Sequence, residues 1–322
     1  MPRTVLITGI TGFAGSHLAE RFVEMGVAVH GYAHEDPPYR HLSRVADRID
    51  IHRGDIGDLA TLRAALERAR PEAVVHLAGQ AVPTLAARDP IGAVRTNVVG
   101  TATVLTALED HPRVRLVVAS SAHVYGAPDA VPVDERAPLR PANVYAATKV
   151  AVEALAREFG QRGANPVTIL RPANQLGPRL HPGLAASAFA KQIAEAEAGV
   201  AEPIVRHGPL EARRDFLDVR DMAAAYALAS DIADEGATTY NVGTGTAVSI
   251  ADVLGILLDL ARVPVRAELD PGRGQTGDAG TLALDARRFR DRTGWAPRRD
   301  LRTSLRDTLD YWRAHVVHGV TA

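Results

Sequence analysis

Short apolar, β-branched runs alternate with amphipathic helical patterns through roughly the first half of the chain. Strict alternation of strand and helix implies crossover connections, which make the strands parallel and cover both faces of the sheet. The sequence therefore predicts an α/β fold with a doubly wound parallel sheet of the Rossmann type. Strands are expected at residues 4–8, 27–32, 49–52, 73–77, 114–119 and 167–170, and helices at 16–24, 59–69 and 91–108.

The alternation changes after Arg171. A stretch rich in Pro and Gly covers residues 172–183, and the elements that follow it are shorter. This change in pattern indicates a second, smaller α/β unit. We predict a dinucleotide-binding domain over residues 1–171, segments around 216–245 that return to it, and a smaller substrate domain over 172–322.

Charge and composition exclude several classes of function. The formal net charge is −1, so no basic surplus favours binding to nucleic acid or to an anionic membrane. The chain has no cysteine, which excludes disulfides and thiolate chemistry, and no metal site is expected. The apolar run at the start is short, and no later apolar run of about 18 residues is evident. We therefore expect a cytoplasmic protein.

A glycine-rich turn joins the first predicted strand to the first predicted helix. Gly9 permits a tight turn, Gly12 leaves room for a pyrophosphate beside the backbone, and Gly15 allows the helix to pack closely on the sheet. The N-terminus of that helix offers N–H groups to phosphates. An ordinary βα turn can also be rich in glycine, but this position in the first βα unit favours a dinucleotide site. The expected cofactor-binding residues here are Thr8, Gly9, Thr11, Gly12, Phe13, Ala14 and Gly15.

The end of the second strand bears on the choice of cofactor. A site for NAD usually has a carboxylate there, which binds the ribose hydroxyls. In this chain the position falls on Ala33, with His34 next, so the missing acid favours NADP(H) over NAD(H). Glu35 follows closely, however, and only Arg40 or Arg44 is near enough in sequence to reach a 2′-phosphate. NAD(H) therefore remains the alternative.

Tyr145 and Lys149 lie four residues apart at the start of a predicted helix, and so share one of its faces. Lys149 and Lys191 are the only lysines, which makes a chance Tyr-x-x-x-Lys rare. A phenol transfers protons poorly at neutral pH, and an adjacent ammonium is expected to lower its pKa. The pair therefore predicts proton transfer by Tyr145, with Lys149 also able to hold the nicotinamide ribose.

Ser120 and Ser121 follow the fifth predicted strand, at the sheet edge where such folds bind ligands. The two hydroxyls could simply cap the strand, but together with the Tyr/Lys pair they favour a serine that binds a carbonyl oxygen. His123 could exchange a proton near neutral pH or merely contact the substrate. The predicted catalytic residues are Ser121, Tyr145, Lys149 and His123.

Three motifs occur in a characteristic order: Thr-Gly-x-x-Gly-x-x-Gly from Thr8, Ser-Ser-x-x-Val-Tyr-Gly from Ser120, and Tyr-x-x-x-Lys from Tyr145. In this the chain resembles the extended short-chain dehydrogenase/reductase family, the NAD-dependent epimerases and dehydratases. Nearly the whole chain takes part in the resemblance. Stretches that are similar to the GDP-4-keto-6-deoxymannose reductases of that family include residues 76–81, 189–193, 213–216 and 240–243.

The resemblance implies roles for further residues. Asn97 would order the active site, Asn174 would contact the substrate, and Lys191 and Arg214 would bind its diphosphate. Asp55 suits an acceptor for the adenine amino group, although a plain turn aspartate fits equally well. The cofactor set then also includes His34, Asp55, Ile56, Leu77, Ala78, Gly79, Asn97, Tyr145 and Lys149, and the substrate set is Ser121, His123, Asn174, Lys191, Arg214, Arg273 and Asp278.

Two positions depart from the family pattern. Family members that dehydrate sugars have a Glu two residues after the Ser or Thr, where this chain has His123, which argues against a 4,6-dehydratase. An Arg-x-x-Asp element that commonly clamps the diphosphate keeps Asp278, but Gln275 stands at the Arg position and Arg273 would have to compensate. The nucleotide base and the sugar therefore stay open.

These patterns together predict an NAD(P)-dependent reductase of a nucleotide-diphosphate 4-keto sugar, in which C4 receives a hydride, Tyr145 supplies the proton and Ser121 binds the oxygen. The alternative is a C4 epimerase, or a related sugar-modifying enzyme, with tightly bound NAD. A non-catalytic NAD(P)-sensing protein is a third hypothesis, but it would not need the catalytic set. The resemblance also implies a homodimer formed through helices near residues 91–108 and 145–160.

Overall fold

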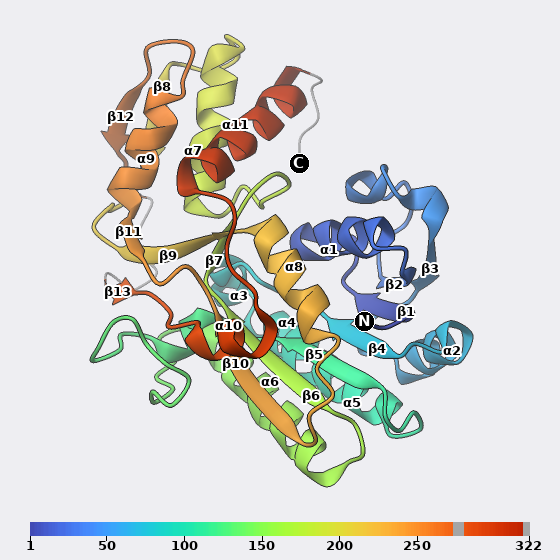
Figure 1. The fold of residues 1–322 in the computed structure, drawn as a ribbon. Helices are drawn as coiled ribbons and strands as arrows, with labels where there is room; N and C mark the ends of the chain where they lie inside the picture. The colour runs from blue at the N-terminus through green and yellow to red at the C-terminus, as the bar shows by residue number, and fades with distance from the viewer. Residues whose placement is uncertain (273–279, 318–322) are drawn as a thin grey trace.

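A seven-stranded parallel sheet forms the centre of the fold (Figure 1). The computed structural model describes residues 1–272 and 280–317. The strand order β10-β6-β5-β4-β1-β2-β3 reverses between β1 and β4, and ligands bind at the carboxyl ends of strands at such a point. The predicted Rossmann-type sheet is confirmed. Its strands are β1 (Thr4–Thr8), β2 (Ala28–Ala33), β3 (Ile49–Arg53), β4 (Ala73–His76), β5 (Arg115–Ala119), β6 (Val167–Pro172) and β10 (Ala237–Val242).

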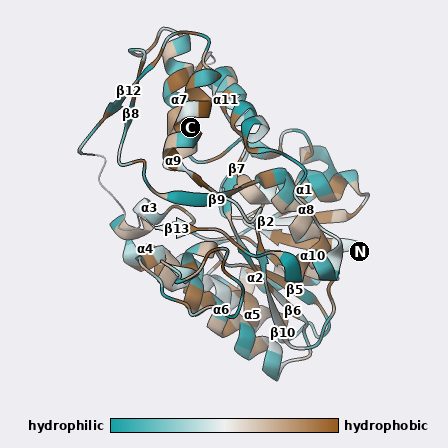
Figure 2. Cartoon of the chain, turned by 60° about the vertical axis from the view of Figure 1, so that its left-hand side comes forward, coloured by the Kyte–Doolittle hydropathy of each residue, from teal (hydrophilic) through white to brown (hydrophobic). Residues whose placement is uncertain are grey.

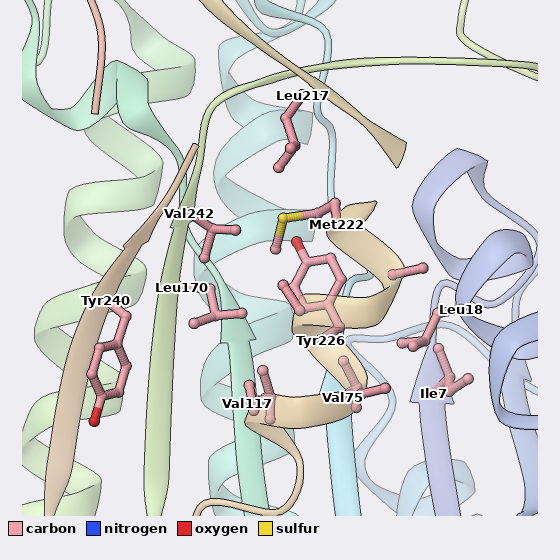
Figure 3. Packing of buried hydrophobic residues seen from close by; sticks show 14 of the residues in the cluster. Ile7, Leu18, Val75, Val117, Leu170, Leu217, Met222, Tyr226, Tyr240 and Val242 are labelled. Carbon is pink, nitrogen blue, oxygen red and sulfur yellow. The ribbon is translucent and has the colours of Figure 1, made fainter. Parts of the chain in front are cut away.

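Helices cover both faces of this sheet because its strands bury side chains on both sides. The consecutive residues Leu6 and Ile7 of β1 pack into two different apolar clusters, as the alternation along a strand requires. Figure 3 shows one of these clusters, in which Ile7 and Tyr226 lie among side chains from several strands. The helices are α1 (Phe13–Glu24), α8 (Val219–Ala229) and α10 (Arg287–Thr293) on that side, and α2 (Leu59–Ala69), α5 (Gly100–Leu108) and α6 (Val144–Arg162) on the other.

Most elements after β6 build a third apolar cluster, apart from the main sheet (Figure 2). Leu257 and Trp312 lie in this cluster and are buried. The elements of this part of the fold are β7 (Asn174–Leu176), β8 (Ile204–His207), β9 (Arg213–Asp218), β11 (Ala247–Ser249), β12 (Arg266–Leu269), β13 (Thr281–Leu282), α7 (Ala185–Glu197), α9 (Ile250–Asp259) and α11 (Leu301–Val317). Segment 219–242 supplies α8 and β10, which belong to the main sheet and its cover.

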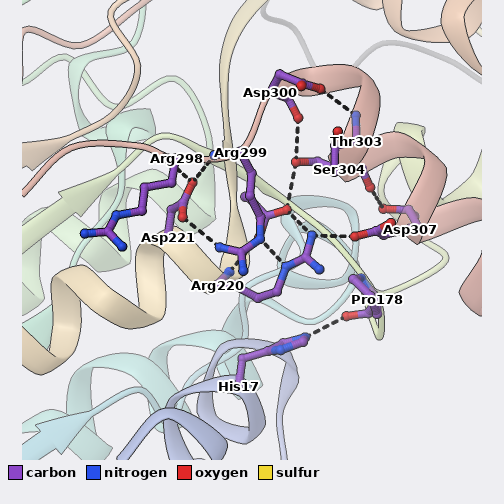
Figure 4. Close-up of polar contacts among 12 residues, drawn as sticks. His17, Pro178, Arg220, Asp221, Arg298, Arg299, Asp300, Thr303, Ser304 and Asp307 are labelled. Atoms are coloured by element: carbon purple, nitrogen blue, oxygen red, sulfur yellow. Dashed lines mark hydrogen bonds and ion pairs between the residues drawn. The ribbon is translucent and has the colours of Figure 1, made fainter.

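Buried carboxylates join α8 to the chain that leads into α11 (Figure 4). Asp221 accepts hydrogen bonds from the backbone N–H of Arg298 at 2.8 Å and of Arg299 at 2.9 Å. Asp218 accepts from the Ser304 hydroxyl at 2.7 Å, and its other oxygen accepts from Arg220. These bonds to charged acceptors fix the last helix relative to the helix that covers the sheet.

One described helical stretch, Pro90–Leu108, passes the length and hydropathy test for a membrane span. It combines α4 (Pro90–Val94), a π-helical turn (Arg95–Val99) and α5. The stretch holds no continuous apolar run of about 18 residues, but most of its polar residues are uncharged, so its mean hydropathy stays high. Half of this apolar segment is buried in the fold, as in the core helix of a soluble protein, so its hydropathy alone is weak evidence for a membrane span.

Candidate active site

The glycine turn has the geometry of a phosphate site. Gly9 adopts φ +69°, and its N–H donates to the carbonyl of Tyr32 at 3.0 Å. A Cβ on Gly15 would lie 2.2 Å from the Gly9 carbonyl oxygen, so only glycine permits this approach of helix and turn. Within the described chain no side chain caps α1 at Gly12, which leaves the first N–H groups of the helix for an anion. The turn therefore fits a dinucleotide pyrophosphate.

The segment after β4 connects this turn to the residues around Lys149. The Ala78 N–H donates to the Thr8 hydroxyl at 3.2 Å, and Leu77 precedes it in chain order. A Cβ on Gly79 would lie 2.8 Å from Asn97 Oδ1 and 3.8 Å from Lys149 Nζ. The structure thus brings these predicted cofactor residues together along one edge of the sheet.

The glycine turn is hydrogen-bonded to Glu35, the acid that follows the end of the second strand. The Thr11 hydroxyl donates a hydrogen bond to the Glu35 carboxylate, whereas His34 is exposed. Asp55 Oδ1 accepts from the N–H of the second residue after it, at 2.7 Å, so this carboxylate shapes its own turn. Ile56 is buried beside it. The roles of His34, Asp55 and Ile56 toward a cofactor stay predictions.

Ser121, Tyr145 and His123 lie next to one another. Tyr145 is in the first turn of α6, whose start is fixed by Asn143, the side chain of which accepts from the Ala146 N–H at 2.9 Å. Ser121 and Tyr145 are both buried, and the Ser121 hydroxyl lies near enough to the phenol to affect the pKa of Tyr145. The ring of His123 stands edge-on to Tyr145, with 5.9 Å between the ring centres. The two hydroxyls can therefore meet one oxygen atom.

Lys149 lies one helical turn after Tyr145, with its ammonium bound to the Ala119 carbonyl at 2.7 Å. Burial lowers the pKa of Lys149 to about 8, and the charge of Glu153 opposes this effect. The pKa of Tyr145 is raised by burial, and the Ser121 hydroxyl opposes that change. The expected lowering of the phenol pKa by the ammonium is therefore wrong for this structure, because burial dominates and the ammonium is held on β5.

Asn97 lies in the π-helical turn between α4 and α5, a feature that often marks functional sites. Its side chain is buried and makes three hydrogen bonds. Oδ1 accepts from the Gln80 N–H at 2.7 Å, and Nδ2 donates to the Gln80 carbonyl at 3.1 Å and to the Thr148 hydroxyl at 2.9 Å. Asn97 thereby ties the segment after β4 to the helix that carries Tyr145 and Lys149.

The other predicted substrate residues, apart from Ser121 and His123, come from the C-terminal elements. Asn174 begins β7 and is half-buried. The Lys191 ammonium, on α7, is 3.6 Å from Glu195 and lies over the Trp312 ring. Arg214, on β9, is buried and donates to two backbone carbonyls, those of Arg213 and Gly280. Arg273 and Asp278, together with Gln275, lie outside the described residues.

Sequence reasoning missed a buried carboxylate behind the catalytic residues. Glu153 is fully buried on α6, and Ser120 and Arg171 both donate to it. The available signal was the spacing, since Glu153 follows Lys149 by four residues and shares its helix face. The pattern was overlooked because an acid on a helix is usually a solvated one.

Comparison with known proteins identifies the family. The GDP-mannose 4,6-dehydratase family matches residues 6–308. The chain belongs to this family. It is 32% identical to the GDP-6-deoxy-D-mannose reductase of Pseudomonas aeruginosa, over 98% of the chain and 99% of that protein. It is also 32% identical to the UDP-glucose 4-epimerase of Mycolicibacterium smegmatis, over 96% of the chain and 98% of that protein.

Two solved structures share the fold over nearly the whole chain. RMD from Pseudomonas aeruginosa complexed with NADPH superposes with a TM-score of 0.82 at 29% identity, over 97% of the chain and 99% of that protein. The UDP-glucose 4-epimerase of Thermus thermophilus in complex with NAD gives 0.84 at 29% identity, over 96% and 98%. The family resemblance inferred from the motifs is confirmed.

Proposed function

We propose that this protein is an NAD(P)-dependent reductase of a nucleotide-diphosphate 4-keto sugar, similar to the GDP-4-keto-6-deoxymannose reductases. The observation that carries the proposal is the pair of buried hydroxyls on Ser121 and Tyr145, with Lys149 one helical turn away and the glycine turn along the same sheet edge. The 32% identity to a GDP-6-deoxy-D-mannose reductase supports the sugar class. A non-catalytic sensor would have no need of this constellation.

Each residue of the set has a distinct task in the proposed reaction. A nicotinamide bound at this edge supplies the hydride that C4 of the sugar receives. The Ser121 hydroxyl donates to the C4 oxygen, and the Tyr145 phenol transfers its proton to that oxygen. The Lys149 ammonium would bind the ribose hydroxyls of the cofactor. Asn97 holds the segment that lines the cofactor site.

Substrate binding is proposed for residues of both halves of the chain. His123 faces Tyr145 edge-on and would form a wall of the sugar pocket. Asn174 would contact the sugar, while Lys191 and Arg214 would interact with the diphosphate. Arg273 and Asp278 are proposed as further diphosphate contacts, and this part of the proposal is based on the sequence alone.

NADP(H) is the proposed cofactor, supported by the missing acid at Ala33 and by the NADPH in the similar RMD structure. One observation favours NAD(H) instead. The Glu35 carboxylate accepts from Thr11 of the glycine turn, where it would repel a 2′-phosphate and accept from ribose hydroxyls. The same observation supports the second candidate function, a C4 epimerase with tightly held NAD, as do the UDP-glucose 4-epimerases among the relatives.

A homodimer is proposed because apolar side chains are exposed on the helical stretch before β5. Ile91 is 67% exposed, Val99 is 49% exposed and Val94 lies between them on the same stretch. An interface would bury these side chains and release the water around them. A cytoplasmic location is likewise a prediction.

Two experiments on purified protein test the function. One sample is denatured, and any nicotinamide cofactor that it releases is identified. A second, native sample is mixed with nucleotide 4-keto sugars and NADPH or NADH. A reductase consumes the reduced cofactor, which is read as loss of its absorbance. Tyr145→Phe should abolish this signal, and Tyr311→Phe, on the last helix, should retain it. Retained NAD together with C4 inversion and no net consumption of NAD(P)H would refute the reductase and support the epimerase.

A further inference from the structure

Glu153 is surrounded by hydrogen-bond donors. Its side chain is fully buried, and both carboxylate oxygens accept from more than one group. Oε1 accepts from the Ser120 hydroxyl at 2.5 Å and from Arg171 Nε at 2.8 Å. Oε2 accepts from Arg171 Nη2 at 2.6 Å and from Arg157 Nη2 at 2.7 Å. Removing a buried carboxylate with this many partners leaves donors unpaired and is costly.

Two bonds, one helical turn apart, tie α6 to the end of β5. Lys149 donates to the Ala119 carbonyl at 2.7 Å, and Glu153 accepts from the Ser120 hydroxyl at 2.5 Å. Ser121 is the next residue along the chain, and Tyr145 precedes Lys149 by one turn. We therefore expect these two hydrogen bonds to control the distance between the Ser121 and Tyr145 hydroxyls.

Glu153 also supplies negative charge close to the buried Lys149 ammonium. The titratable groups that interact with this ammonium are Glu153 from its own helix and His76 from β4. The Glu153 carboxylate is itself paired with Arg171 from β6, and Tyr145 lies one helical turn before Lys149. Burial, with the Lys149 charge contributing, lowers the pKa of His76 to about 3, so this ring is neutral. Among the described residues Glu153 is thus the acid that opposes the loss of the Lys149 proton.

We propose that Glu153 is a positioning residue that keeps Lys149 in its ammonium form and sets the separation of Ser121 and Tyr145. This role is supported by its complete burial, its bond to Ser120 and its place one helical turn beyond Lys149. The inference rests on the proposed catalytic roles of these residues. The effect on Lys149 itself can be measured without turnover.

The test uses the small number of lysines. In protein grown with lysine labelled by ¹³C at Cε, only Lys149 and Lys191 give signals, and Lys191→Arg assigns them. Glu153→Gln is expected to lower the Lys149 titration midpoint by about one pH unit. The alkaline limb of kcat/KM should move with it, whereas a purely structural role would lower activity at all pH values alike.

Separate variants distinguish charge from geometry. Glu153→Asp keeps the charge and should leave the midpoint near that of the wild type. Ser120→Ala should also leave the midpoint unchanged but lower kcat about 10- to 100-fold, because one tie is lost. Arg157→Ala, which removes a partly exposed donor from the same carboxylate, is the control and should change neither quantity substantially.

Glu153→Gln leaves the buried Arg171 guanidinium without its carboxylate partner and for that reason can fail to fold. The double variant Glu153→Gln/Arg171→Gln removes both charges and is used in that case. It should lower the midpoint as well, since Glu153 is the charged group that acts on Lys149. An unchanged Lys149 midpoint in either folded variant overturns the inference, even if the enzyme is active. A lowered midpoint in a protein that reduces no 4-keto sugar would refute the proposed function and leave the charge effect of Glu153 established.

Discussion

Replacing Gly15 with alanine should damage the glycine turn and, with it, cofactor binding. A Cβ at this position would lie 2.2 Å from the carbonyl oxygen of Gly9 and 2.8 Å from Cα of Ile10. Both neighbours are backbone atoms, so no flexible side chain can move aside. Ordinary contact begins at 3.4 Å, and α1 would therefore have to move away from the turn by about 1 Å.

The size of the effect follows from this overlap. Overpacking of a close contact costs about 1–3 kcal/mol of folding free energy. A displacement of about 1 Å would also lengthen the hydrogen bonds between the start of α1 and the pyrophosphate. Losing one charge-assisted bond of about 1.5–3 kcal/mol weakens binding by about 10- to 150-fold. Gly15→Ala should therefore lose both stability and cofactor affinity.

Gly255→Ala is the matched control because Gly255 lies inside α9, exposed, with no heavy atom near enough to meet a Cβ. Here the same substitution should stabilise the fold by about 0.5–1 kcal/mol, since alanine loses less backbone entropy in a helix. Urea unfolding gives the stability of both variants, and calorimetric titration with NADPH and NADH gives their affinity. A Gly15→Ala variant that is as stable as the wild type and binds cofactor equally well would refute the close-contact argument.

Three further predictions concern the proposed catalytic and binding residues. Tyr145→Phe should lower kcat by about 10²- to 10⁴-fold and leave cofactor affinity intact, since the phenol acts in proton transfer; turnover near that of the wild type would remove Tyr145 from this role. Glu35→Gln should shift the ratio of NADPH to NADH affinity toward NADPH, because it removes a negative charge near a 2′-phosphate, and an unchanged ratio would show that Glu35 does not select the cofactor. Arg214→Ala should raise the dissociation constant of the nucleoside diphosphate by about 10- to 150-fold. For that variant calorimetry is compared with Arg213→Ala, a change of the exposed neighbour, and equal binding by all three proteins would place the diphosphate elsewhere.

Local sequence patterns were sufficient to predict the class of fold, and they also supplied the residues that are proposed to be catalytic. Apolar periodicity placed β1 and α2 with the bounds that the structure has, because it reflects which side of an element is buried. The spacing of Tyr145 and Lys149 and the three glycines are equally local features. The start of α1 was predicted late because glycine and alanine near Phe13 carry no amphipathic signal.

Other properties depended on residues that are far apart in sequence, and only the tertiary structure decided them. The burial that raises the pKa of Tyr145 and lowers that of Lys149 is contributed by neighbouring elements of the fold. The bond between Thr11 and Glu35 and the bonds that surround Glu153 form where separate strands and helices meet. Desolvation and charge pairing are properties of the packed chain, so the sequence determined which groups are present while the fold determined their protonation and their partners.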